Sequence, residues 1–127
     1  MTTDDVMHIG EVASRTELSL RSLRHWDEVG LVVPSGRSEG GFRLYTADDV
    51  EKILVIRRMK PLGFSLEQMK AVMADIETIR AATGDLHGAR RRLRGVLSEA
   101  AERRDRLTRQ LAMADEFITL VRREADA

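Results

Sequence analysis

Hydrophobic residues recur at helical spacing near the start of the chain and predict two short helices in succession. Ile9, Val12 and Ala13 lie at i, i+3 and i+4, and Leu20, Leu23 and Trp26 also recur at helical spacing. The first helix is expected over His8–Leu18. Ser19 is a good N-cap for the second helix, and Gly30 supplies the left-handed residue that commonly ends a helix. Two short helices joined by a tight turn predict a helix-turn-helix, of which the second helix is normally the reader.

The polar face of the second helix carries basic side chains one turn apart. Arg21, Arg24, His25 and Glu28 lie opposite the apolar stripe, where residues three or four apart are neighbours. A short helix with such a basic face is suited to binding in a groove of another molecule. The major groove of DNA is the favoured candidate, because its width admits one helix.

A glycine-rich hairpin is expected directly after this helix pair. The segment 31–34 reads as a short extended piece, 35–41 as a polar loop and 42–45 as a strand with Arg43 and Tyr45 on one side. Arg37 in the loop is placed to follow a phosphate backbone or to enter a minor groove. An ordinary surface hairpin is the alternative, and the neighbouring helix pair favours a wing.

Two further helices follow the hairpin. Thr46 caps the third, which should end or kink at Pro61, since proline removes a hydrogen bond and disfavours helical angles at Lys60. Ser65 opens a capping box for the fourth helix, expected to run to about residue 79. Its methionines are read as core residues. Residues 1–7 are polar and expected to be disordered.

A heptad pattern fills the remainder and predicts one long helix of about 54 Å at roughly 1.5 Å per residue. Its apolar stripe has little of its own chain to pack on, so a second copy is the natural partner. The residues assigned to dimerisation are Leu86, Leu93, Leu97, Leu107, Leu111, Ile118 and Val121. The expected division is a DNA-binding domain over residues 1–80 and a dimerisation helix over residues 81–127.

Composition narrows the chemistry. The 127 residues contain no cysteine, so disulfides, thiolate metal sites and thiol redox switches are excluded. The histidines lie far apart and the carboxylates are scattered, so we expect no metal site, no cofactor and no enzymatic activity. No apolar run is long enough to cross a bilayer, and the expected location is the cytoplasm. The net charge is zero and does not itself favour nucleic acid.

Taken together, the motifs resemble the MerR family of transcription regulators, in particular its multidrug-responsive branch. The matching segments, which span essentially the whole chain, are residues 9–13, 23–31, Pro34, 41–45 and 62–66, followed by the heptad helix. The resemblance implies a mainly α fold, in which a winged helix-turn-helix domain is followed by a long C-terminal helix. That helix would dimerise as an antiparallel coiled coil. It also implies that a homodimer binds a pseudo-palindromic element of double-stranded promoter DNA, bends and untwists it, and works there with RNA polymerase.

Residue roles follow by position from the resemblance. The DNA-contacting set comprises residues of the second helix, the wing and the end of the third helix, namely Ser19, Arg21, Arg24, His25, Arg37, Arg43, Tyr45, Arg57, Arg58 and Lys60. The second helix would meet the major groove, Arg43 and Tyr45 would hold phosphate beside the wing, and the last three residues would form a second backbone contact. Pro61 departs from the family pattern and affects the aim of that second contact.

Family members that sense metals or oxidants use cysteines, and those that sense drugs use an additional C-terminal domain. This sequence shows neither feature. Three options stay open: a small-molecule effector in an apolar pocket beside Met69 and Met73, control by protein abundance, or a fragment of a longer sensor. Two other functions are less compatible with these residues. A coiled-coil interaction adaptor is disfavoured by the phosphate-suited arginines, and an excisionase-like architectural factor is disfavoured by the long dimer helix.

Overall fold

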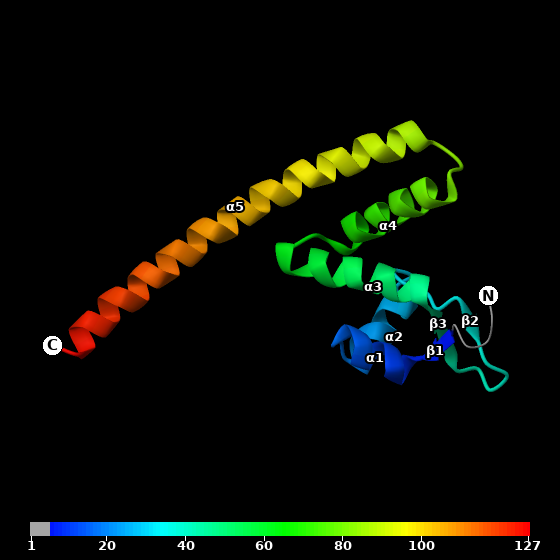
Figure 1. The fold of residues 1–127 in the computed structure, drawn as a ribbon, viewed down its shortest axis with the longest axis horizontal. Coiled ribbons are helices and arrows are strands. Elements are labelled where there is room, and N and C mark those ends of the chain that lie inside the picture. The colour runs from blue at the N-terminus through cyan, green and yellow to red at the C-terminus, as the bar shows by residue number, and fades with distance from the viewer. Residues whose placement is uncertain (1–5) are drawn as a thin grey trace. The chain divides into compact units, whose positions relative to one another are not determined.

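The computed structural model describes residues 6–127, which form two compact units (Figure 1). The first extends to Glu77 and the second comprises Thr78–Ala127. The predicted class, mainly helical with a winged helix-turn-helix and a long C-terminal helix, is confirmed. Of the segment predicted to be disordered, residues 1–5 lie outside the described part. Val6 and Met7 contradict the prediction, since they belong to a strand and Met7 is buried.

The first two helices are α1 (Ile9–Thr16) and α2 (Leu20–Glu28). They are joined through Glu17, a left-handed residue that ends α1, and Ser19, whose side chain accepts a hydrogen bond from the Ser22 amide. Leu23 and Trp26 are buried as predicted. Leu20 was expected in the core but is 40% exposed, because it is the first residue of its helix and lies beyond the edge of the packed face.

The wing is part of a three-stranded antiparallel sheet with the order β1-β3-β2. Its strands are β1 (Val6–His8), β2 (Gly36–Arg37) and β3 (Arg43–Thr46). Two expectations were wrong in detail. The segment 31–34 forms no strand, and β2 lies within the predicted loop. Phe42 precedes the strand and is 68% exposed. The strand β1 was missed because its three residues gain their hydrogen bonds only from the distant β3.

Helix α3 (Ala47–Met59) begins with a capping box between Thr46 and Asp49. The Asp49 carboxylate accepts hydrogen bonds from the Thr46 amide at 2.9 Å and from the Ser35 amide and hydroxyl at 3.0 and 2.7 Å. The helix ends at Met59 and a 3-10 turn, η2 (Lys60–Leu62), follows, as Pro61 predicted. Lys60 nevertheless keeps helical angles, φ −57° and ψ −47°, so the predicted displacement of this residue was wrong.

Helix α4 (Leu66–Ala81) starts with the predicted capping box, in which Ser65 and Gln68 exchange hydrogen bonds. Its buried residues include Met69, Val72 and Met73, so the methionines are core residues as predicted. Lys52 on α3 pairs with Glu77 at 2.8 Å and Asp48 at 3.3 Å. Burial alone would lower the pKa of Lys52, but these two bonds outweigh it and raise the pKa.

The second unit consists chiefly of α5 (Leu86–Ala125), a helix of 40 residues. Asp85 caps it by accepting the Gly88 amide at 2.9 Å. Leu86 and Leu93 are half-buried. Beyond them the apolar residues of the predicted stripe are largely exposed, and these are Leu97, Leu107, Leu111, Ile118 and Val121.

Candidate nucleic-acid interface

Helix α2 presents its basic side chains to solvent because its other face is fixed in the core. Leu23 and Trp26 anchor that inner face. Arg21, Arg24 and His25 are exposed on the outer face, as the sequence predicted. Ser19 is occupied as the N-cap, and its hydroxyl also donates to that of Ser22 at 3.0 Å. The cap fixes where the helix starts and therefore where the arginines lie.

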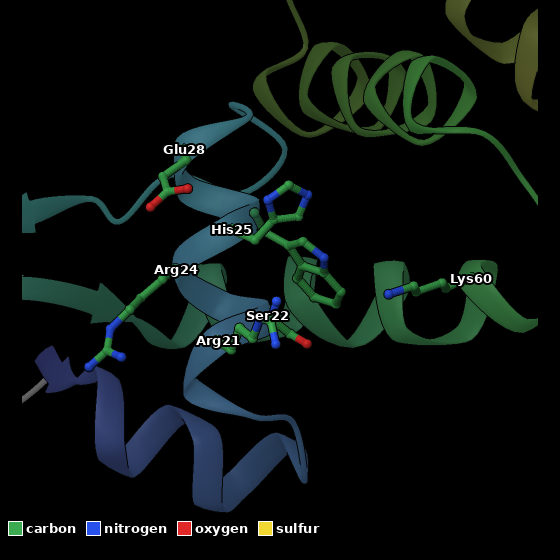
Figure 2. A pocket seen from close by; sticks show the side chains of 7 residues that line it. Arg21, Ser22, Arg24, His25, Glu28 and Lys60 are labelled. Carbon is green, nitrogen blue, oxygen red and sulfur yellow. The ribbon is translucent and has the colours of Figure 1, made fainter.

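These side chains surround an open hollow of about 750 Å³, shown in Figure 2. Its wall comprises Arg21, Ser22, Arg24, His25, Trp26 and Glu28 of α2, together with Lys60 from the far end of α3. The Lys60 ammonium lies 5.9 Å from the centroid of the Trp26 ring, at the distance of a cation–π contact. Three permanent cations beside one carboxylate make this surface suited to a polyanion.

The two wing arginines share one carboxylate on α2. The Asp27 Oδ2 atom accepts hydrogen bonds from Arg43 Nε at 2.6 Å and from Arg37 Nη2 at 3.1 Å. Arg37 also donates to the carbonyl of Gly41 at 3.3 Å across the wing loop. The bond to Asp27 raises the pKa of Arg43, so its positive charge is secure. The structure thus places both arginines beside α2.

Tyr45 occupies a position that sequence reasoning did not foresee. It is 1% exposed, and its hydroxyl has no hydrogen-bond partner among residues 6–127. Burial raises the pKa of this phenol, and the Asp27 charge raises it further. The proposed phosphate contact of Tyr45 therefore requires the wing to move and uncover the hydroxyl, because in this conformation it is enclosed.

The three cations at the end of α3 do not act as one group. The Arg57 Nη1 atom donates a 2.7 Å hydrogen bond to the carbonyl of Thr16, near the end of α1. This bond joins α3 to α1 and occupies one guanidinium nitrogen of Arg57. Arg58 and Lys60 remain exposed, and Lys60 lines the hollow on α2.

Asp27 is the residue at this interface that sequence reasoning missed. The sequence shows it only as one acid among several on helices, and nothing in its local spacing marks it. Its partners lie 10 and 16 residues further along the chain. Only the register of β2 with β3 brings those two guanidinium groups together. A pairing of that kind depends on tertiary structure and leaves no periodic signal.

Other kinds of site find no support in the described part of the chain. Residues 6–127 contain no cluster of three acidic, histidine or cysteine side chains able to hold a metal ion. No helix in that range is long and apolar enough to cross a membrane. A second hollow of about 360 Å³ has Met73 in its wall, with apolar residues 31–33 and the ammonium groups of Lys52 and Lys70. The predicted effector pocket lay beside Met69 and Met73, and of these two residues only Met73 lines this hollow.

Comparison with known proteins assigns the family. The family described as MerR HTH family regulatory protein matches residues 7–76. The HTH-type transcriptional regulator CueR of Vibrio cholerae is 42% identical over 67 residues, which are 53% of this chain and 48% of CueR. The chain spans about half the length of the curated relatives it matches.

Solved structures agree with this assignment. A MerR-family transcriptional regulator from Bacillus cereus is 30% identical with a TM-score of 0.54, over 87% of this chain and 78% of that one. HiNmlR, a MerR family regulator lacking the sensor domain and bound to promoter DNA, has a TM-score of 0.68 at 24% identity, over 90% and 79% of the two chains, and supports the fold alone. These relatives are regulators and not enzymes, in agreement with the sequence prediction. The chain belongs to the MerR family of helix-turn-helix regulatory proteins.

Proposed function

We propose that this chain is a sequence-specific transcription regulator that binds promoter DNA through α2 and the wing. The observation that carries the proposal is the exposed cationic surface of Arg21, Arg24, His25 and Lys60 around one hollow, directly beside a winged hairpin. Its family supports the proposal, and HiNmlR, which shares the fold, is a regulator bound to promoter DNA. A helix with this outer face fits the major groove.

Within this proposal the side chains divide into readers and positioners. Arg21, Arg24 and His25 meet base edges, because they lie on the outermost face of α2. Ser19, as the N-cap, holds the start of that helix close to the DNA backbone. Arg37 contacts the strand of phosphates beside the wing, Arg43 holds β3 against α2, and Tyr45 stays enclosed in the core. Arg58 and Lys60 supply a second phosphate contact, while Arg57 acts through the position of α1.

The proposed functional state is a homodimer. The exposed stripe on α5 makes a coiled coil with a second copy, which we infer to be antiparallel, and so holds two reading surfaces at a fixed separation. Two such surfaces related by a two-fold axis match a pseudo-palindromic element. If their separation differs from that of the half-sites on straight DNA, binding must bend or untwist the duplex, at a cost of about 1–6 kcal/mol. The phosphate contacts offset that cost, and polymerase would then use the distorted promoter.

The decisive experiment selects duplexes from a random library with the wild-type protein and measures affinity for the selected and scrambled sequences. Arg21→Ala should relax the sequence preference, whereas Lys60→Ala should weaken binding to both duplexes and reduce the salt dependence. Arg15→Ala is the matched control, because Arg15 is an exposed arginine paired with Glu11 on the helix that does not read. Failure to enrich any duplex would reject the proposal and favour the interaction-adaptor alternative.

A further inference from the structure

We propose that Asp27 is the positioning residue that fixes the wing against the reading helix and that it keeps Arg37 available for exchange onto a DNA phosphate. This inference rests on the proposed DNA-binding function and deepens it. It begins from the sheet register, in which Arg37 on β2 lies directly opposite Arg43 on β3.

Directly opposed residues of an antiparallel pair point to the same face, so the two guanidinium groups are neighbours. Like charges in that arrangement repel and destabilise the pairing. The strand β2 has only two residues, and the hydrogen bonds among Ser38, Gly41 and Phe42 that continue the hairpin do not compensate this charge. The Asp27 carboxylate contacts both groups and compensates their charge. The wing therefore depends on a residue of α2 for its closed arrangement.

The two ion pairs differ in access to solvent. The Asp27 side chain is 10% exposed and that of Arg43 is 23% exposed, and the bond between them is the shorter one. The Arg37 side chain is 49% exposed and its bond to the same oxygen is longer. A phosphate approaching the wing therefore meets Arg37 first. Arg37 can transfer from Asp27 to phosphate while Arg43 stays bound and maintains the position of β3.

Asp27→Asn tests this arrangement, because it keeps the shape of the side chain and removes its charge. Glu39→Gln is the matched control, since Glu39 is an exposed acid in the wing loop and loses the same charge. Both variants should bind scrambled duplex slightly better than wild type through the added positive charge. Only Asp27→Asn should lose selectivity, by about tenfold in the ratio of the two dissociation constants. Adding Asp27→Asn to a protein already lacking both wing arginines should change the ratio no further.

The outcomes separate the two proposals. A wild-type protein that selects no sequence overturns the proposed function and this inference together. A selective wild type whose Asp27→Asn variant keeps the same ratio as Glu39→Gln overturns the inference alone.

A measurement on the wild type covers the case in which Asp27→Asn does not fold. The guanidinium NMR signals of Arg37 should shift on addition of the selected duplex, whereas the Arg43 Nε–H signal should stay protected from exchange. Loss of protection at Arg43, or an unchanged Arg37, would overturn the inference.

Discussion

At the scale of single residues, one buried carboxylate connects the start of the wing with the start of α3. Asp49 accepts three hydrogen bonds, from the Thr46 amide and from two groups of Ser35. It is 3% exposed and Thr46 is 9% exposed, so the Thr46 amide left without this carboxylate would be shielded from water. The position of Asp49 therefore affects both α3, which Lys60 follows, and the segment that leads into β2 and Arg37.

Asp49→Ala should destabilise the fold by about 2–3 kcal/mol, because it removes a helix cap and leaves partly buried donors unpaired. Denaturant unfolding measures this change. Asp48→Ala is the control, since its side chain is exposed and its ion pair with Lys52 lies at the surface. An equal loss in both variants would show that the first turn of α3, and not the carboxylate of Asp49, is responsible.

Arg57 and Arg58 are sequence neighbours with different environments, and they allow stability to be separated from DNA binding. Arg57→Ala should lower the free energy of unfolding by about 1–2 kcal/mol, because its charge-assisted bond to the Thr16 carbonyl is lost. Arg58→Ala should leave stability unchanged and weaken DNA binding independently of sequence. Thermal unfolding and binding to scrambled duplex are measured on both variants. The assignment is wrong if the two variants exchange these effects.

At the scale of elements, the helices were predictable because each carries its own signal. The start of α2 follows from Ser19 and its end from Gly30, and the buried face follows from Leu23 and Trp26. The end of α3 followed from Pro61. Such signals are local, and they hold wherever the neighbouring chain contributes little to the choice of structure.

The sheet and the electrostatic part of the site were less predictable, because both depend on residues far apart in sequence. Met7 belongs to a strand only because it pairs with Tyr45. Asp27 acquires its role only when β2 and β3 align two arginines. Arg57 looked like part of a basic cluster, and only the packing of α3 against α1 shows that it binds a carbonyl. The exposed basic face of α2 was predictable from the sequence, whereas the contacts that hold the wing beside it were not.

The glycine that follows α2 allows a prediction about how the end of that helix affects stability. Gly30 has a φ of +74°, and a Cβ there would meet only the Lys70 ammonium, at an ordinary 3.9 Å. Gly30→Ala should therefore cost about 1 kcal/mol through backbone strain alone. Gly10→Ala within α1 has open space and no positive φ, and it should stabilise the fold by about 0.5 kcal/mol. Denaturation curves that shift in the same direction for both would contradict this account.

At the scale of the whole molecule, the exposed apolar residues of α5 are the basis of the proposed association. The side chains of Leu107 and Leu111 are 45% and 63% exposed in the single chain. Burying an apolar side chain of this size contributes about 1.5–3 kcal/mol, so a continuous stripe favours pairing with a second copy. Homodimer formation is therefore testable separately from DNA binding.

Leu107→Arg combined with Leu111→Arg should give a monomer with much weaker binding to the selected duplex, because charge is placed within the proposed seam. Light scattering at micromolar concentration measures the mass. Ser98→Arg combined with Ala112→Arg adds the same charge at exposed positions away from the stripe and should leave a dimer. A wild-type chain that is monomeric under these conditions would refute the proposed architecture.

The order of the two compact units along the chain also has a consequence for synthesis. Elements β1 to α3 precede Thr78, and the exposed stripe of α5 is translated after them. At about 5–20 residues per second, the ribosome needs several seconds to make the remainder of the chain, while small domains fold within about a second or less. The first unit is then already folded when α5 emerges. Newly made chains on one message are therefore the nearest partners, and we expect subunits to pair preferentially with copies translated from the same transcript.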